Sequence, residues 1–358
     1  MTAKVCCYSC KGLTFHRGLY YRFVQMTLTH PMKYLCIFLS IWLFGCSEVQ
    51  KKPDISQQVS AQGTVTAALC PAKQLAAVSS TTSGIVVRDI ATATDKYRLS
   101  HQNPVDNLVT LLAFSADCDY LLSADRRHVA LWQLSDGKNL GFWSMLGDTT
   151  VRDIAVLAYG TYVAIAQNDG KIQHINLKTG RRLEFLGHTR DTNAVDFNVN
   201  ALAMSPNGRY VLSGGNDYKS YLWDSQSGQV LQSFTHPSRV TKVALDDAGR
   251  FLFTADSQKQ AEIYDINSGN KVSQLQIDRA QSFSSARFSA DGKQLLTGSP
   301  AQQVVVWDVS SGQKIRSWSV SPNPNSRPAN ALVYDAIFTP TGSVVTLSSA
   351  GLLEIWNP

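Results

Sequence analysis

The sequence predicts an all-β fold in which seven sheets of four antiparallel strands stack into a closed ring. Three observations predict it: a short phrase that recurs along the chain, glycine turns at regular places around it, and an apolar body with few charges. The phrase is an apolar strand that ends, in most copies, in an aromatic residue followed by an acidic or amide residue. Its seven copies occupy residues 86–90, 130–134, 173–177, 221–225, 262–266, 305–309 and 354–358.

The spacing of these copies indicates what kind of ring they form. The equivalent position in successive copies is held by Arg88, Trp132, Ile175, Trp223, Tyr264, Trp307 and Trp356. The successive spacings are 44, 43, 48, 41, 43 and 49 residues. A period in this range is the signature of a propeller built from four-stranded blades. One copy cannot bury its own apolar faces, so the copies must stack, and seven are enough to close a ring. We therefore predict a seven-bladed β-propeller over residues 55–358.

The fourth repeat shows the expected elements of a blade, which we name a to d from the ring axis outward. We expect strand a at 201–205, strand b at 210–214, strand c at 220–224 and strand d at 230–234. Gly208 lies in the a–b corner and Gly228 in the c–d corner. Glycine supplies the positive φ that tight hairpins demand. The same corner chemistry recurs in most of the other repeats.

The two ends of the propeller region predict how the ring closes. The seventh repeat stops after its strand c, at Trp356-Asn357-Pro358. A missing outer strand would leave a bare sheet edge, which is an aggregation hazard. Residues 55–61 precede the first strand a, which begins near Thr64, and have no place in the first repeat. We predict that they supply the outer strand of the last blade.

The net charge of +6 does not indicate a nucleic-acid partner. Residues 1–45 carry five basic side chains and no acidic one, and the rest of the chain holds 28 basic and 27 acidic side chains. Nucleic-acid binding requires a clustered basic stripe, and the body has no such run. The apolar content of the whole chain, 44% with 17% charged residues, suits a well-buried β domain.

The start of the chain has the pattern of a targeting segment. From Met32 it reads Met-Lys, then eleven mostly apolar residues at 34–44, then Gly45-Cys46-Ser47. This run is too short to span about 30 Å of hydrocarbon, which takes roughly 20 helical residues. It fits the apolar region of a secretory signal peptide at 32–45, with Lys33 as the positive residue in front. A buried strand or a membrane anchor with an incidental cysteine is the alternative interpretation.

The segment Leu43-Phe44-Gly45-Cys46 resembles a bacterial lipobox. The resemblance implies cleavage before Cys46 and lipidation of that cysteine, whose acyl chains would hold the protein at a bilayer. Ser47 is not the aspartate that resembles an inner-membrane retention signal, so we expect an outer-membrane anchor with the propeller facing the periplasm. Residues 46–54 would form a lipidated tether. We interpret residues 1–31 as a mis-called upstream start or an extended leader, and the true start (Met1, Met26 or Met32) stays open.

Residues from about 55 to 358 resemble the WD-repeat family in their period, their corners and their Trp-Asp phrases. In that family a histidine before strand a, a Ser or Thr in b, an Asp in the b–c turn and the Trp of c form a buried hydrogen-bonded tetrad. The resemblance implies one complete tetrad here, formed by His188, Ser213, Asp217 and Trp223. We interpret it as structural and not as a catalytic group. The first and third repeats lack the aromatic residue of strand c.

The body of the sequence lacks the motifs that catalysis or the binding of a phosphate or metal ion would require. It has no Gly-x-Ser-x-Gly elbow, no His-Glu-x-x-His, no phosphate-cradling glycine loop and no calcium-loop pattern. We therefore expect neither an enzyme nor a bound metal or cofactor. The alternative is a propeller enzyme or small-ligand-binding protein with its site at the axial channel.

Two cysteines of the body raise the question of a disulfide. Cys70 and Cys118 fall at the a–b corners of adjacent blades. An oxidising compartment would permit a disulfide between them. The interpretation that we favour from the sequence is two unpaired, small core residues.

The expected binding surface is the rim that carries the b–c and d–a loops, because these loops vary while the a–b and c–d corners are short and uniform. Two long d–a loops, at 188–198 and 321–330, explain the spacings of 48 and 49 residues. Variable loops on a rigid ring usually carry binding, and Arg and Tyr are enriched at energetic centres of interfaces. The candidate residues are Arg126, Arg127, Arg190, Tyr218 and Arg327. With the WD-repeat resemblance, they predict a scaffold for an unidentified protein or peptide. Drift in surface loops is the alternative interpretation.

Overall fold

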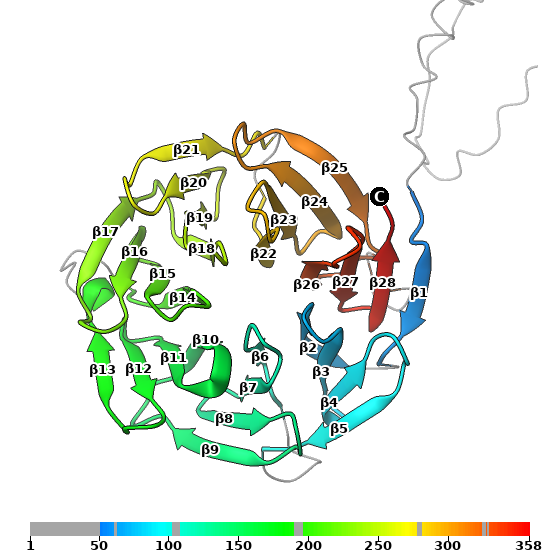
Figure 1. The fold of residues 1–358 in the computed structure, drawn as a ribbon, viewed down its shortest axis with the longest axis horizontal. Helices are drawn as coiled ribbons and strands as arrows, with labels where there is room; N and C mark the ends of the chain where they lie inside the picture. The colour runs from blue at the N-terminus through cyan, green and yellow to red at the C-terminus, as the bar shows by residue number, and fades with distance from the viewer. Residues whose placement is uncertain are drawn as a thin grey trace, which may run out of the picture. The chain divides into compact units, whose positions relative to one another are not determined.

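The computed structural model confirms an all-β, seven-bladed propeller (Figure 1). It describes residues 51–60, 63–101, 108–189, 196–277, 281–323, 327 and 329–358. Within these residues 28 strands form seven four-stranded antiparallel sheets around a central axis. None of the described residues belongs to a helix that is long and apolar enough to cross a membrane.

The first three blades each follow the chain as a meander from the axis outward. Blade 1 contains β2 (Thr64–Cys70), β3 (Leu75–Ser80), β4 (Gly84–Asp89) and β5 (Asp95–Leu99). Blade 2 contains β6 (Leu111–Phe114), β7 (Tyr120–Ala124), β8 (His128–Gln133) and β9 (Asn139–Ser144). Blade 3 contains β10 (Val151–Val156), β11 (Tyr162–Gln167), β12 (Ile172–Asn176) and β13 (Arg182–Phe185), with the 3-10 helix η1 (Ala158–Gly160) in its a–b corner.

The next three blades repeat this order. Blade 4 follows the 3-10 helix η2 (Gly187–Thr189) and contains β14 (Val199–Met204), β15 (Tyr210–Gly215), β16 (Lys219–Asp224) and β17 (Val230–Thr235). Blade 5 contains β18 (Val240–Leu245), β19 (Phe251–Asp256), β20 (Ala261–Asp265) and β21 (Lys271–Gln274). Blade 6 contains β22 (Ser285–Phe288), β23 (Gln294–Gly298), β24 (Gln303–Asp308) and β25 (Lys314–Ser319).

Blade 7 is built from both ends of the propeller region, as predicted. Its inner strands are β26 (Val333–Phe338), β27 (Val344–Ser348) and β28 (Leu352–Trp356), and its outer strand is β1 (Ile55–Gln58). β1 pairs antiparallel with β28, with Ile55 opposite Ile355. The pairing extends one residue beyond each end of β1, because the N–H of Asp54 and the N–H of Val59 also donate to carbonyls of the last repeat.

The fourth blade shows where the predicted strand limits differ from the structure. Strand a was expected from Ala201, but β14 begins two residues earlier, at Val199. Val199 still pairs with Gly215, and the register then shifts before Ala201 pairs with Gly214. A bulge places one extra residue in one strand, which the alternating apolar pattern does not reveal. Strands b, c and d agree with the prediction to within one residue.

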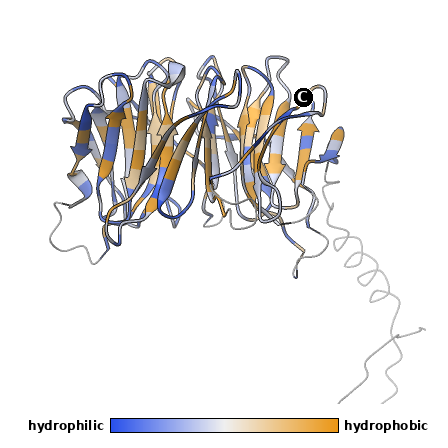
Figure 2. Cartoon of the chain, turned by 90° about the horizontal axis from the view of Figure 1, so that it is seen from below, coloured by the Kyte–Doolittle hydropathy of each residue, from blue (hydrophilic) through white to orange (hydrophobic). Residues whose placement is uncertain are grey.

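The apolar core lies in the seams between neighbouring blades. The aromatic residue of strand c packs toward the preceding blade: Trp132 shares a core cluster with Val87 of blade 1, and Trp223 stacks on Phe185 of blade 3. Trp307 packs in the same way with Phe253 of blade 5. Figure 2 shows the apolar colouring concentrated along the strands, between the two rims of the ring. The seams therefore hold the blades together and leave the rims to the loops.

Antiparallel strand order places the four kinds of connection on two rims. The a–b and c–d corners lie on one rim, and the b–c and d–a connections lie on the other. The corners of the first rim close tightly, because Gly208 and Gly228 adopt φ of 73° and 74°, which other residues adopt at a cost. We call the second rim, with the b–c and d–a connections, the loop rim.

Candidate interaction face and its supporting network

The four residues of the expected tetrad lie together in blade 4. His188 Nδ1 lies 2.9 Å from Asp217 Oδ1, and His188 Nε2 lies 2.8 Å from Ser213 Oγ. The indole N–H of Trp223 donates to the same Ser213 Oγ at 2.8 Å. The side chains of His188 and Asp217 are both 0% exposed. A substrate cannot reach them, so this geometry supports a structural role.

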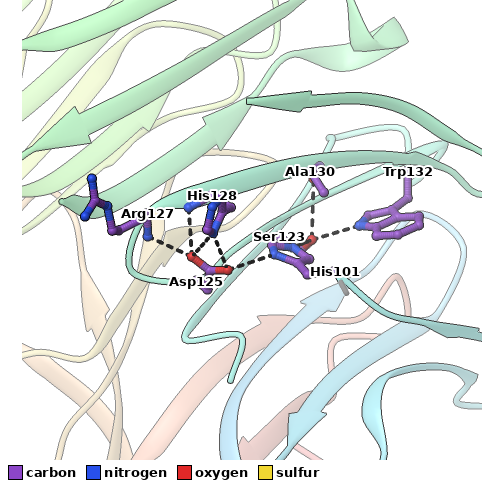
Figure 3. A network of polar contacts seen from close by, with 7 residues as sticks. All are labelled: His101, Ser123, Asp125, Arg127, His128, Ala130 and Trp132. Carbon is purple, nitrogen blue, oxygen red and sulfur yellow. Dashed lines mark hydrogen bonds and ion pairs between the residues drawn. The ribbon is translucent and has the colours of Figure 1, made fainter. Parts of the chain in front are cut away.

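Blade 2 holds a second complete tetrad, so the expectation of only one full set was wrong (Figure 3). His101 Nε2 lies 2.7 Å from Ser123 Oγ, and the indole N–H of Trp132 donates to Ser123 Oγ at 2.8 Å. His101 Nδ1 lies 3.4 Å from Asp125 Oδ2. This set was not recognised in the sequence because Asp125 follows its serine by two residues, whereas Asp217 follows its serine by four. The segment from the serine to the tryptophan is one residue shorter in blade 2 than in blade 4, and the earlier carboxylate reaches the histidine.

Asp125 also fixes the loop that follows it (Figure 3). Its Oδ1 accepts hydrogen bonds from the backbone N–H of Arg127 and of His128, both at 2.7 Å. Its Oδ2 lies 3.0 Å from His128 Nδ1. Burial opposes ionisation of Asp125, but the hydrogen bonds from His101, Arg127 and His128 outweigh it and hold the pKa of this carboxyl well below its ordinary value. An ionised Asp125 thus joins the buried tetrad to the loop rim.

The described candidate binding residues are exposed and come from three separate places on the loop rim. Arg126 and Arg127 lie in the β7–β8 connection, Tyr218 in the β15–β16 turn and Arg327 between β25 and β26. Tyr218 is 51% exposed. Among the described residues, no hydrogen bond or ion pair links these three places. Arg190 lies outside the described residues, and so does the expected lipidation site, Cys46.

Backbone contacts brace the loop rim near these residues. The guanidinium of Arg127 donates to the carbonyl of Gly147, in the d–a connection that follows the same blade. The carbonyl of Tyr218 accepts the N–H of His236, in the next d–a connection, at 2.8 Å. Each b–c turn is thus tied to a neighbouring d–a connection, so exposed side chains project from supported backbone.

Cys70 and Cys118 form a disulfide, so the favoured interpretation of unpaired cysteines was wrong. Their sulfurs lie 1.99 Å apart and their Cα atoms 5.9 Å apart. Cys70 ends β2, and Cys118 lies in the a–b corner of blade 2. The two corners are neighbours on the ring although they are 48 residues apart in the chain. Residue types alone did not establish that distance.

The axial channel is a cavity of about 1010 Å³ that opens among the a–b corners. The inner strands of the seven blades line it, and its wall includes charged residues that the sequence analysis did not single out. These are Asp153, Lys242, Asp247, Arg287, Asp291, Arg316 and Asp335. The described lining contains no histidine. Among the described residues no group of His, Cys, Asp and Glu is arranged to hold a metal ion.

Two of the channel carboxylates join adjacent blades. Asp335 Oδ2 accepts hydrogen bonds from Arg287 of blade 6 and from the N–H of Leu69 of blade 1, both at 2.9 Å. Asp153 Oδ2 accepts the N–H of Leu202 of blade 4 at 2.8 Å. Burial raises the pKa of Asp153, and the charge of Lys242 opposes that rise. Both carboxylates thus accept hydrogen bonds from the protein itself.

Comparison with known proteins matches a stretch that spans the outer strand of blade 3 and the three inner strands of blade 4. Residues 181–224 match the family model named WD domain, G-beta repeat. The matched stretch holds the whole blade 4 tetrad. It covers one repeat of this chain. The other blades are identified from their strand order in the structure.

Three relatives share parts of the sequence. The small ribosomal subunit protein RACK1z of Oryza sativa subsp. japonica is 32% identical over 106 residues, which is 28% of this chain and 31% of that protein. WD repeat-containing protein 82 of Drosophila melanogaster is 25% identical, over 53% of this chain and 57% of that protein. Serine-threonine kinase receptor-associated protein of Gallus gallus is 25% identical, over 40% and 39%. The chain thus spans less than two thirds of each relative's length.

A solved structure shares the whole fold. The β-propeller domain of Cps50 (Swd1) from Myceliophteria thermophila superposes with a TM-score of 0.69 over 85% of this chain and 100% of that chain. Its sequence identity is 16%, so this likeness establishes the fold alone.

Proposed function

We propose that this protein is a membrane-anchored scaffold whose loop rim binds another protein or a peptide. The observation that carries the proposal is the pair Arg126 and Arg127, which is exposed on a loop held from within the blade by Asp125. Arginine on a supported, solvent-facing loop is the kind of residue that dominates interface energetics. Tyr218 and Arg327 add side chains of the same interface type on this rim.

The anchor and the compartment are supported by two independent features. Residues 32–47 have the order of a lipoprotein signal, and lipidation of Cys46 would place the protein on the bacterial outer membrane, facing the periplasm. The disulfide between Cys70 and Cys118 suits an oxidising compartment such as the periplasm. The relatives named above come from a plant and two animals and cover only part of the chain. The compartment therefore rests on the leader pattern and the disulfide.

Catalysis or small-ligand binding in the axial channel is not the function we propose. A deep polar funnel with convergent histidines or carboxylates would favour it. The described lining has no histidine. Of the four aspartates in this lining, Asp153 and Asp335 accept hydrogen bonds from neighbouring blades.

Charge reversal on the loop rim tests the binding proposal. The variant combines Arg126→Glu, Arg127→Glu and Arg327→Glu, and the matched control combines Arg209→Glu, Lys293→Glu and Lys314→Glu on the opposite rim. The cross-linked, membrane-anchored protein is isolated, and its attached partner is identified by mass spectrometry. We expect the first variant to lose the partner and the control to keep it. Equal loss from both variants, or no loss from the first, would show that this face is not the binding surface.

Substitution of the expected lipidated cysteine tests the anchor separately. Cys46→Ser should abolish acylation and release the protein from the membrane fraction. Cys36→Ser, within the same apolar run, should keep both acylation and membrane attachment. Retention of the Cys46→Ser protein in the outer membrane after an alkaline wash would contradict the anchor while leaving the rim proposal intact.

A further inference from the structure

Aromatic side chains from neighbouring blades pack against each other in the seams of the propeller. A ring on the outer strand d of one blade lies against a ring on strand c of the next. Three seams have both rings: Phe185 with Trp223 at 5.0 Å, Phe234 with Tyr264 at 4.2 Å, and Trp318 with Trp356 at 5.9 Å between centroids. A pair of aromatic rings, one from strand d and one from strand c of the next blade, therefore fills the outer part of these seams.

The seam between blades 2 and 3 has the ring on strand d but no ring on strand c. Trp143 holds the strand d position, because it is opposite Val129 as Phe185 is opposite Ile172. The matching strand c position belongs to Ile175, which has no ring. Among the described residues, no aromatic ring stacks on Trp143.

A groove lies where the absent ring would be. Its cavity of about 410 Å³ is lined by Trp143 and Ile175, with Leu131 and Gly141 beside them. At its mouth, on the outer strand β9, Leu140 is 46% exposed and Phe142 is 44% exposed. This volume lies within the range of small-ligand pockets, so the groove can take a bicyclic aromatic side chain.

The charge around the groove is positive. Arg182 lines it, and Lys178 and Arg181 lie in the adjoining c–d corner of blade 3. Within the described part of the chain, none of these three side chains has an ion pair. The nearby acidic residue Glu184 lies 3.9 Å from Lys171. Unpaired cations beside an apolar slot favour an anionic partner.

We propose that this groove is a second binding site, which takes an acidic peptide segment by inserting one tryptophan side chain against Trp143. The inserted indole would occupy the place that a strand c aromatic fills in the other seams. The flanking carboxylates would face Lys178, Arg181 and Arg182. The groove faces the outer wall of the ring, next to the c–d corners, and is therefore separate from the loop rim.

The test uses a blocked, fluorescein-labelled peptide of sequence Asp-Glu-Asp-Trp-Asp-Glu-Asp and the full chain purified in detergent. Fluorescence polarisation at about 50 mM salt limits screening of the charges. One control peptide has alanine in place of tryptophan, and another has lysine in place of every acidic residue. We expect each control to bind at least about tenfold more weakly, which corresponds to about 1.4 kcal/mol.

A repeat-restoring variant gives the sharper comparison. Ile175→Trp would fill the groove with the chain's own ring, and Ile165→Ser would supply the hydroxyl that accepts its N–H. Ile165 has the place of Ser213, since it is opposite Gln173 as Ser213 is opposite Tyr221. The double variant should lose peptide binding, and its melting temperature shows whether the altered core still folds. A surface variant, Arg181→Glu with Arg182→Glu, should weaken binding at least about tenfold without entering the core.

Three results would overturn the proposal. The first is equal binding of the alanine and tryptophan peptides. The second is unchanged binding by the Arg181→Glu/Arg182→Glu variant, which tests the site even if the double core variant fails to fold. The third is self-association of the protein that the Ile175→Trp/Ile165→Ser variant abolishes, because the groove would then hold a second copy. The Arg126→Glu/Arg127→Glu/Arg327→Glu protein should bind the peptide as the unmodified protein does, which separates this site from the loop rim.

Discussion

The Nδ1 atom of His188 lies 2.9 Å from Oδ1 of Asp217, and neither side chain is exposed to solvent. The pair joins the segment that enters blade 4 to the b–c turn of the same blade. Because His188 also faces Ser213, and Ser213 accepts the indole N–H of Trp223, one chain of contacts runs from the loop rim into the seam with blade 3. The loops of this rim are thus coupled to the packing beneath them.

Removing the hydroxyl of Ser213 should show how much this series of contacts contributes to the stability of the fold. Ser213→Ala deprives Trp223 and His188 of their shared partner in a buried place. We expect the free energy of unfolding to fall by about 2 kcal/mol, since each buried polar group left without a partner costs about 1–3 kcal/mol. Urea denaturation measures the loss. The exposed Ser144→Ala should change it by less than about 0.5 kcal/mol. Equal stability of the two variants would contradict the role of the tetrad.

The second tetrad should respond in the same way. Ser123→Ala removes the partner of Trp132 and of His101 in blade 2. We expect a loss of similar size, about 1–3 kcal/mol, because the bonding pattern is the same. Urea denaturation beside Ser213→Ala compares the two sets directly. A negligible effect of Ser123→Ala would mean that the blade 2 network lacks the function of its blade 4 counterpart.

The disulfide should add stability by joining corners of blades 1 and 2. The loop that it closes spans 48 residues, and cross-links over loops of this size typically contribute about 2–4 kcal/mol. We expect the Cys70→Ser/Cys118→Ser variant to melt at a lower temperature than the unmodified protein. A reductant should lower the melting temperature of the unmodified protein and leave that of the variant unchanged. The same response in both would show that the bond does not form.

Several parts of the fold could be predicted because they depend on local pattern and on counting. The spacing of the copies determined the number of blades, and the unassigned residues 55–61 beside an incomplete last repeat predicted the closing strand. The disulfide could not be predicted in this way. It depends on the distance between the corners that hold Cys70 and Cys118, which arises only when neighbouring blades pack.

The contacts of single side chains were harder to foresee for the same reason. Asp125 lies two residues after its serine, whereas the aspartate of the blade 4 tetrad lies four residues after its serine. A search at the blade 4 spacing therefore overlooked Asp125. The ring missing at Ile175 was visible in the sequence, where it indicates a degenerate repeat. To predict the resulting groove beside Trp143, one must know which ring lies across the seam. Asp153 and Asp335 were not singled out from the sequence, because their partners come from adjacent blades.

The low pKa of Asp125 predicts a pH-dependent contribution to stability. In the folded protein this carboxyl binds its proton less tightly than in the unfolded chain, where its pKa is about 4. Its stabilising effect is therefore present above about pH 4 and is lost as the pH falls through the lower, folded value. At about pH 7, Asp125→Asn should reduce the free energy of unfolding by about 1–3 kcal/mol, because hydrogen bonds to a charged acceptor are lost.

The gap between the unmodified protein and Asp125→Asn should shrink as the pH is lowered. Denaturation of both proteins at about pH 7 and about pH 3 measures it, and the gap is expected to be smaller at the lower pH. A gap that stays constant, or that widens toward low pH, would show that Asp125 is not held ionised by its partners. The binding of a rim partner should weaken in the same variant, because the loop of Arg126 and Arg127 loses its support.

The closing strand offers the most direct test of the ring. A protein that begins at Gln62 lacks β1 and leaves β28 as a bare edge. Loss of the β1–β28 ladder should cost several kcal/mol, at about 1 kcal/mol per net hydrogen bond, against a total stability of about 5–15 kcal/mol. Ile55 is 54% exposed, so the loss should come mainly from backbone bonds.

The matched control for this truncation is a protein that begins at Lys51, which lacks residues 1–50 and keeps β1. Thermal unfolding of the two proteins, followed by circular dichroism, measures the contribution of the strand. We expect the protein that begins at Gln62 to melt well below the control and to aggregate at lower concentration, because an unpaired edge can pair with another copy. Melting temperatures within about 2 °C of each other would contradict this expectation, since a loss of several kcal/mol should shift the midpoint further than that, at about 2–4 °C per kcal/mol in domains of about 150–250 residues.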